Sequence, residues 1–407
     1  MSAPSSPAPS PSPPGDRPAG GVVFFAHGFR PFFLAAAAWA LAALVLWLAV
    51  LTGAVVLPSA FDAVTWHAHE MLFGFVFAAV AGFLLTAVPS WTGRPPLNGL
   101  PLALLALLWV GGRVGVAVSA VIGPLAAALI DLALPAALVV VIATAIVGSR
   151  NWRNLPMAAG LIILAAANGL FHAEALGWAD TAAIGWRLAI AMVTLMIGLI
   201  GGRIVPSFTR NWLTKRGESA LPAPFSMFDG ATLAATVLWA ALWTALPDHA
   251  ASAVAALIAG VLHGVRLARW RGWRTGPEPL VWVLHLGYLW VPVGLLLVGA
   301  AGMWPAIPAS AAIHALTAGA MATMILAVMT RATLGHTGRA LTAGPATAVL
   351  YAMVIAVAPL RIAAPLAPDL YWPLLVLSGL LWTGAFAIFL AVYGPMAFRP
   401  RVDGTAG

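Results

Sequence analysis

The sequence predicts an all-α integral membrane protein, a polytopic bundle of twelve transmembrane helices with both termini in the cytoplasm. Composition is the first reason: 62% of the 407 residues are hydrophobic and 8% are charged, whereas soluble domains carry about 25% charged residues. The second reason is that apolar segments of about 20 residues, enough to cross a bilayer, recur along the chain. The third is that basic residues gather after every second segment.

Two short connections, at Gly123-Pro124 and Pro247-Asp248, decide the number of helices. Fusing the segments on either side of one connection would change the count and reverse every later helix. We expect the segments to stay separate. No internal repeat is evident in the motifs. The expected helices span residues 31–57, 64–88, 99–121, 124–148, 155–177, 182–205, 228–247, 250–268, 280–301, 310–330, 344–363 and 371–396.

The distribution of basic residues supports this topology, because cytoplasmic loops of membrane proteins are enriched in Lys and Arg. With twelve helices, 17 of the 20 basic residues fall on the cytoplasmic side. The net charge of +8 therefore reflects topology rather than a nucleic-acid partner. The acidic residues expected on the outer side are Asp62, Glu174, Asp180, Asp248 and Asp369. The 17 basic residues are Arg17, Arg30, Arg94, Arg150, Arg153, Arg203, Arg210, Lys215, Arg216, Arg266, Arg269, Arg271, Arg274, Arg331, Arg339, Arg399 and Arg401.

Residues 1–21 are rich in Pro, Ser and Ala and lack the basic start and apolar core of a signal peptide. We expect a disordered cytoplasmic tail there, then a transmembrane domain over 22–398 and a short cytoplasmic tail over 399–407. The chain has no cysteine, which excludes disulfides, iron–sulfur clusters, thiolate haem ligation and covalently attached haem. Any metal must be held by His, Asp, Glu, Met or Tyr.

The stretch Trp66-His-Ala-His-Glu-Met71 opens the second predicted helix. Ionisable side chains at membrane depth cost about 2.5–3.5 kcal/mol each and usually mark a functional site. Imidazole is the commonest metal ligand, so His67 and His69 are predicted to bind metal or haem. They lie about 200° apart in a regular helix, so they would serve neighbouring centres unless the helix start is unwound. Glu70 shares a face with His67, where a carboxylate would ligate a second metal or deliver protons.

The remaining histidines divide by their expected side of the membrane. His172 and His314 lie at the outer ends of their helices and would join His67 and His69 in an outer cluster. For His249 and His263 we favour simple hydrogen bonding to a neighbouring helix. The histidines expected near the cytoplasm are His27, His285 and His336, surrounded by Arg30, Arg203, Arg331 and Arg339.

Three arginines, Arg113, Arg187 and Arg361, depart from the topology rule because each lies near the outer end of a predicted helix. They would either extend to lipid headgroups or pair with buried anions such as haem propionates. Asp131 is a lone carboxylate in an apolar segment. It would bond a neighbour or join a proton path.

The motifs closely resemble the NnrS family of haem- and copper-containing membrane proteins of the bacterial nitric oxide response. WHAHEM at 66–71 and RATLGHTGR at 331–339 are the most specific, and the last two predicted helices add hydropathy alone. The matching stretches are Gly28–Phe33, Trp66–Gly74, Gly82–Pro89, Trp91–Gly93, Gly202–Pro206, Phe208–Thr209, Leu284–Trp290, His314–Gly319 and Val328–Arg339.

The resemblance implies haem b, one or two per chain, together with copper or another non-haem metal. It also implies residence in the bacterial cytoplasmic (inner) membrane and protection against nitric oxide. Within matched motifs it suggests metal ligation by His67, His69, His285, His314 and His336. Anion-binding roles would fall to Arg30, Arg203, Arg331 and Arg339, whereas His172 rests on topology alone.

We therefore predict a membrane haem protein that binds and removes nitric oxide, leaning towards an oxidoreductase that reduces nitric oxide to nitrous oxide. Glu70 would be the catalytic proton carrier, and an unidentified electron donor would supply electrons. Two alternatives stay open: a transporter or handler of metal, haem or nitrosyl-iron species, and a nitric oxide sensor. Clustering of polar residues at helix ends argues against a carrier, whose binding site usually lies at the midplane. Short loops leave no room for a sensor's output domain.

Overall fold

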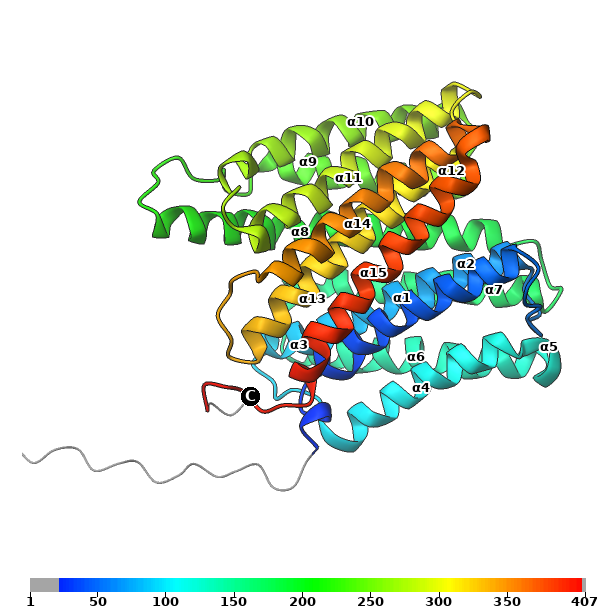
Figure 1. Cartoon of the computed structure of the whole chain (residues 1–407), viewed down its shortest axis with the longest axis horizontal. Helices are drawn as coiled ribbons and strands as arrows, with labels where there is room; N and C mark the ends of the chain where they lie inside the picture. Colours follow the sequence, from blue (N-terminus) through cyan, green and yellow to red (C-terminus); the bar gives the residue numbers. More distant parts are fainter. Residues whose placement is uncertain (1–21, 405–407) are drawn as a thin grey trace, which may run out of the picture.

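The computed structural model describes residues 22–404, and every regular element within them is a helix. Eleven helical segments in this part of the chain are long and apolar enough to cross a membrane. Together with α9 (Met227–Ala245) they run side by side as one tilted bundle, with α9 and α10 (Ala250–Ala268) at one edge and α4 (Gly99–Ala117) and α6 (Pro124–Gly148) at the opposite edge (Figure 1). The predicted polytopic all-α membrane fold is confirmed. The tail predicted over residues 1–21 lies outside the described residues.

The eleven spans correspond to eleven of the twelve predicted segments. The segment predicted at 228–247 is also helical, as α9 (Met227–Ala245), but it is not among the eleven. Asp229 lies in its first turn, where it caps the helix start together with Ser226. The count of twelve crossings and the cytoplasmic placement of both termini therefore stay predictions.

Three of the uninterrupted long helices begin at a proline. Pro124, Pro279 and Pro345 each occupy a first helical position, where a missing N–H costs nothing. Besides α9, the uninterrupted long helices are α1 (Phe29–Leu51), α4 (Gly99–Ala117), α6 (Pro124–Gly148), α7 (Leu155–Ala175), α8 (Ala182–Lys215), α10 (Ala250–Ala268), α11 (Pro279–Met303), α14 (Pro345–Ala363) and α15 (Tyr371–Ala397). Short elements are α5 (Ser119–Ile122) and the single turns Val23–Phe25, Trp152–Asn154, Gly272–Arg274, Ala364–Leu366 and Pro368–Leu370.

Two membrane helices are composite, because a π-helical segment of seven residues interrupts each. The first consists of α2 (Ala63–His69), η2 (Glu70–Val76) and α3 (Phe77–Thr92). The second consists of α12 (Ala309–His314), η5 (Ala315–Met321) and α13 (Ala322–His336). π-Helical turns inside α-helices occur frequently at functional sites. In both composite helices the π segment begins directly after a histidine, His69 or His314.

The composite helices belong to two four-helix units that pack alike. In the first unit α1, the composite helix, α4 and α6 follow one another; in the second, α11, the composite helix, α14 and α15 do so, with matching neighbour contacts. Gly74 and Gly319 are each the fifth residue of their π segment. Each lies against a tryptophan of the preceding helix, Trp39 or Trp290. This repeat was not predicted, because the two units share residue spacing more than residue identity.

Candidate functional site

Asp62 fixes the start of α2 and hence the direction of its histidines. Its Oδ1 accepts backbone N–H groups of Val64 at 2.9 Å and Thr65 at 3.1 Å, the standard N-cap arrangement. Asp62 precedes the membrane span. Partial burial would raise its pKa, but the hydrogen bonds from Thr65 and Val64 outweigh burial and hold that pKa below its usual value.

His67 and His69 point into different surroundings, as their angular separation predicts. The His67 ring stacks on Trp47 with centroids 4.5 Å apart and lines a cavity, and its Nδ1 is buried without a hydrogen-bond partner. His69 is fully buried and lies among Phe61, Phe73 and other aromatic rings. The two histidines therefore belong to two separate candidate sites.

The first candidate site, here called the outer cavity, has a volume of about 480 Å³. Both composite helices contribute to it, together with α1, α8, α14 and α15. Most of its lining is apolar or aromatic, including Trp47, Trp186 and Trp382. Its ionisable lining residues are His67, Glu174, Asp180, His314 and Arg361.

His314 is held in one tautomer by its neighbours. Its Nδ1 lies 2.7 Å from the carbonyl oxygen of Ser310, so Nδ1 carries the donated proton. Its Nε2 lies 3.0 Å from Arg361 Nη2. Arginine only donates, so Nε2 must be the unprotonated nitrogen. A neutral imidazole is the form that ligates a metal. Here its Nε2 lone pair accepts the hydrogen bond from Arg361, which a metal bound at Nε2 would have to replace.

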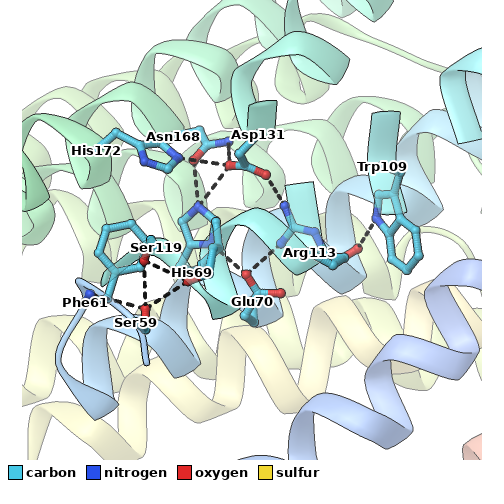
Figure 2. Close-up of polar contacts among 12 residues, drawn as sticks. Ser59, Phe61, His69, Glu70, Trp109, Arg113, Ser119, Asp131, Asn168 and His172 are labelled. Carbon is cyan, nitrogen blue, oxygen red and sulfur yellow. Dashed lines mark hydrogen bonds and ion pairs between the residues drawn. The ribbon is translucent and has the colours of Figure 1, made fainter. Parts of the chain in front are cut away.

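The second candidate site, here called the polar cluster, is a closed network around His69 (Figure 2). His69 Nδ1 lies 3.0 Å from Glu70 Oε1. On the other side of the ring, Nε2 lies 2.8 Å from Asn168 Oδ1 and 3.2 Å from Asp131 Oδ2. Arg113 joins the two carboxylates, because its Nη1 donates to Glu70 Oε1 at 2.8 Å and its Nη2 pairs with Asp131 Oδ1.

The remaining bonds of the polar cluster join α6 to α7. Asn168 Nδ2 donates to Asp131 Oδ2 at 2.8 Å, and His172 Nε2 lies 3.1 Å from the same oxygen. All of these side chains are at most 4% exposed. Buried charges are retained only when paired, and here two carboxylates face Arg113 and the His69 ring. Both nitrogens of that ring meet acceptor oxygens, which matches a doubly protonated imidazolium and makes the network neutral.

The polar cluster also offers ligands for a metal ion. One ligand atom each from His69, Asp131 and His172 lie within 4.8 Å of one another. Two imidazoles and a carboxylate are a donor set used for iron, copper and zinc. A cation there would replace the Nε2 protons of His69 and His172 that face Asp131 Oδ2. The residues therefore fit a metal, although in this structure they bond to each other.

Glu70 lies in the polar cluster and does not line the outer cavity, so the structure separates it from His67. The predicted outer cluster divides accordingly: His67 and His314 face the cavity, whereas His69 and His172 join Asp131. Asn168 was not predicted as a site residue. It is polar within an apolar segment and four residues before His172, so helical spacing placed both on one face. That spacing was the signal that could have identified it.

The residues predicted for an inner site have other partners. Arg30 Nη1 donates to the carbonyl oxygens of Ala397 at 2.8 Å and Arg399 at 2.9 Å, at the end of α15. Arg203 donates to Asn154 Oδ1 at 2.6 Å. Arg331 lies 4.0 Å above the Phe208 ring.

The inner histidines contact different helices. His285 Nε2 lies 2.8 Å from Thr209 Oγ1 on α8, and His336 packs near Phe29 on α1, with ring centroids 5.5 Å apart. Arg339 is 3.5 Å from the carbonyl oxygen of Thr337. None of the predicted inner residues lines the outer cavity. Their metal and anion roles stay predictions.

His263 hydrogen-bonds two neighbouring helices, as predicted, whereas His249 bonds within its own helix. His263 lies 2.8 Å from Thr236 Oγ1 and 2.7 Å from the Tyr288 hydroxyl, so both its nitrogens are satisfied. His249 accepts the backbone N–H of Ala251 at 3.1 Å and caps α10. Both residues therefore serve helix packing and capping.

Together, the fold and the two sites define a polytopic helical membrane protein with metal-competent histidines on its two composite helices. The chain belongs to the NnrS family, because the family model described as NnrS protein matches residues 23–401. Comparison with curated proteins gave no significant match. Family membership indicates a membrane protein of the nitric oxide response and agrees with the resemblance found in the sequence.

Proposed function

We propose that the protein binds and removes nitric oxide at a haem or metal centre in the outer cavity. The observation that carries the proposal is that His67 and His314, from the two composite helices, face one apolar cavity. Among the described residues His67 Nδ1 has no hydrogen-bond partner, and His314 is neutral, with Nε2 unprotonated and accepting from Arg361. Nitric oxide is small and apolar, so it would enter from the lipid through an apolar lining without a pore.

The lining fits a haem in chemical character. A haem needs an apolar space, one or two axial imidazoles and cationic partners for its propionates. The outer cavity offers Trp47, Trp186 and Trp382 as apolar walls, two histidines and Arg361. When bound, a haem b would supply an iron that binds diatomic gases and accepts single electrons. Copper or another non-haem metal would take the His69, Asp131 and His172 set.

The polar cluster would supply protons to the reaction. Two molecules of nitric oxide, two electrons and two protons give one nitrous oxide and one water. Glu70 Oε2 is buried and has no hydrogen-bond partner, while Glu70 Oε1 accepts from Arg113. A carboxylate with one free oxygen takes up and releases a proton without breaking its ion pair. The electrons would come from a separate donor in the bacterial cytoplasmic membrane.

The test uses detergent-purified protein, a pyridine haemochrome assay, metal analysis and steady-state nitric oxide consumption with an electron donor. His67→Ala and His314→Ala should each remove the haem absorption signature and the consumption together. His249→Ala is the matched control, because His249 only caps α10, and it should keep both. If both cavity variants retain haem and consumption, the assignment is wrong.

A second candidate function is transport of metal, haem or nitrosyl-iron species. The observation that favours it is the interruption of two central helices by π segments, because carriers often bind substrate where helices are discontinuous. Consumption of nitric oxide in detergent requires no second compartment, whereas transport does. Haem-free protein that consumes no nitric oxide but moves a labelled metal into vesicles would establish this alternative.

A further inference from the structure

We propose that Arg361 makes the outer cavity an anion site that takes a carboxylate or a small oxoanion. This deepens the proposed function, since it concerns the same cavity, but it does not depend on nitric oxide chemistry. The argument compares the two four-helix units. Each unit places one arginine near the outer end of the helix that follows its composite helix: Arg113 on α4 and Arg361 on α14.

In the first unit the chain itself provides the counter-charge. Arg113 pairs with Glu70, which directly follows His69, and with Asp131 on α6. The guanidinium is therefore neutralised on two sides. This is what burial of a cation requires, because an unpaired buried charge is strongly unfavourable.

In the second unit, uncharged residues occupy the two positions equivalent to Glu70 and Asp131. The residue after His314 is Ala315. Position 131 of α6 corresponds to Ser378 of α15, because six buried residues of α6 recur at one constant interval among the buried residues of α15. The six of α6 are Ala128, Asp131, Pro135, Leu138, Ile142 and Ile146, and their counterparts in α15 are Leu375, Ser378, Trp382, Ala385, Phe389 and Tyr393. Ser378 and Arg361 line the same cavity.

Arg361 has no carboxylate within ion-pair distance in the described part of the chain. Its neighbours are uncharged, namely the His314 ring and the Tyr371 hydroxyl. Its Nη1 is buried and has no hydrogen-bond partner among residues 22–404. The two acids of the cavity do not fill the gap, because Glu174 Oε2 accepts the Ala182 N–H at 2.7 Å and Asp180 is exposed.

The missing partner is therefore an anionic ligand in the cavity. A guanidinium prefers planar oxygen anions, which it binds with two parallel hydrogen bonds. The same chemistry has two sources: the carboxylate of a bound organic cofactor, such as a haem propionate, or a free small oxoanion such as nitrite. Ser378 marks where the first unit carries its carboxylate, so the anion should lie between Arg361 and α15.

Three variants of purified protein test this: Arg361→Gln, Arg361→Lys and Ser378→Asp. Nitrite binding to haem-free protein is measured by calorimetry. Affinity for haem b and for its dimethyl ester, which lacks carboxylates, is measured by absorption titration. Arg187→Gln is the matched control, because Arg187 is also an outer-end arginine but does not line the cavity. Thermal unfolding of each variant verifies folding.

If the anion is a cofactor carboxylate, unaltered protein should prefer haem b to its ester by about tenfold or more, the expected size of a charge-assisted bond. Arg361→Gln should abolish that preference while Arg361→Lys retains part of it. If the anion is a free oxoanion, nitrite binding should follow the same order. Ser378→Asp supplies a carboxylate within the chain and should suppress either ligand, whereas Arg187→Gln should bind both normally.

Equal binding of nitrite, haem b and ester to folded Arg361→Gln and unaltered protein would overturn the proposal. These are binding measurements, so they stand apart from turnover. Anion binding that depends on Arg361 without any nitric oxide consumption would leave this inference intact and reject the proposed function. Nitric oxide consumption without any Arg361-dependent anion binding would support the proposed function and reject this inference.

Discussion

His69 on α2 and Asn168 on α7 are in direct contact, with His69 Nε2 2.8 Å from Asn168 Oδ1. The Asn168 amide also donates to Asp131 Oδ2 at 2.8 Å, so one fully buried side chain satisfies two partners. Asn168 therefore connects the histidine of the first composite helix to the carboxylate of α6. It acts on the polar cluster by fixing where the His69 ring and Asp131 lie.

Asn168→Leu should destabilise the protein by about 1–3 kcal/mol, because it removes two buried hydrogen bonds to charged partners. His69 Nε2 then keeps only Asp131 as an acceptor, and Asp131 Oδ2 keeps only His69 and His172 as donors. Thermal unfolding in detergent, followed by circular dichroism, measures the change. The control is Thr144→Val on the lipid-facing side of α6, whose hydroxyl bonds only within its own helix. Equal unfolding temperatures for the two variants would contradict the network.

Glu70 and Arg113 should show strong energetic coupling, because the two side chains are 0% and 5% exposed. Breaking a buried ion pair by removing one partner costs about 3–5 kcal/mol. Glu70→Gln and Arg113→Gln should each destabilise the protein by an amount in that range, and the double variant by less than their sum. A double-mutant cycle on unfolding free energies gives the coupling. Additive effects would mean that the two groups act independently.

Gly74 and Gly319 should each be intolerant of alanine. A Cβ at Gly74 would lie 2.3 Å from Trp39 Nε1, and one at Gly319 would lie 2.6 Å from Trp290 Cγ. Overpacking of this kind costs about 1–3 kcal/mol. Gly169→Ala is the control, because nothing lies within 4 Å of its Cβ position, and alanine there should be neutral or stabilising. Thermal unfolding of the three variants tests this, and unfolding temperatures for the Gly74 and Gly319 variants as high as that of Gly169→Ala would contradict it.

Asp62 should make stability depend on pH at the acid end. Its folded-state pKa lies below the ordinary value of 3.8 because of the hydrogen bonds from Thr65 and Val64. The unfolded chain therefore binds the proton more readily, and stability falls as pH drops through the ordinary value towards the folded one. Asp62→Asn keeps a capping side chain but removes the titration. Its stability should change less between pH 5 and pH 3, whereas an unchanged slope would exclude Asp62 as the cause.

Hydropathy predicted the bounds of those helices whose full length is apolar. The segment expected at 371–396 is α15, Tyr371–Ala397. The segment expected at 182–205 continues to Lys215, because the polar turn after Arg203 keeps its helical hydrogen bonds beyond the apolar part. The π segments were not predicted, because a wider helical turn leaves no mark on composition.

The candidate sites were predicted in part, because geometry within one helix is readable and geometry between helices is not. The angular separation of about 200° between His67 and His69 in a helix agrees with their different surroundings in the structure. Arg113 was expected to reach lipid headgroups or to pair with a buried anion such as a haem propionate, and it pairs with the buried carboxylates of Glu70 and Asp131, which were not predicted as its partners. Only the packing of α4 against α6 brings Asp131 within reach. Sequence alone gives no register between two apolar helices.

The contact of Arg30 with the end of α15 has a consequence for biosynthesis. Arg30 is 2% exposed, and the carbonyl oxygens that it binds belong to Ala397 and Arg399, 367 and 369 residues later in the sequence. Until these residues have left the ribosome, the guanidinium on α1 lacks these partners. The α1 helix can thus complete this contact only after α15 has been synthesised. A truncation before Ala397 would leave a newly inserted helix with an unpaired cation for quality control to recognise.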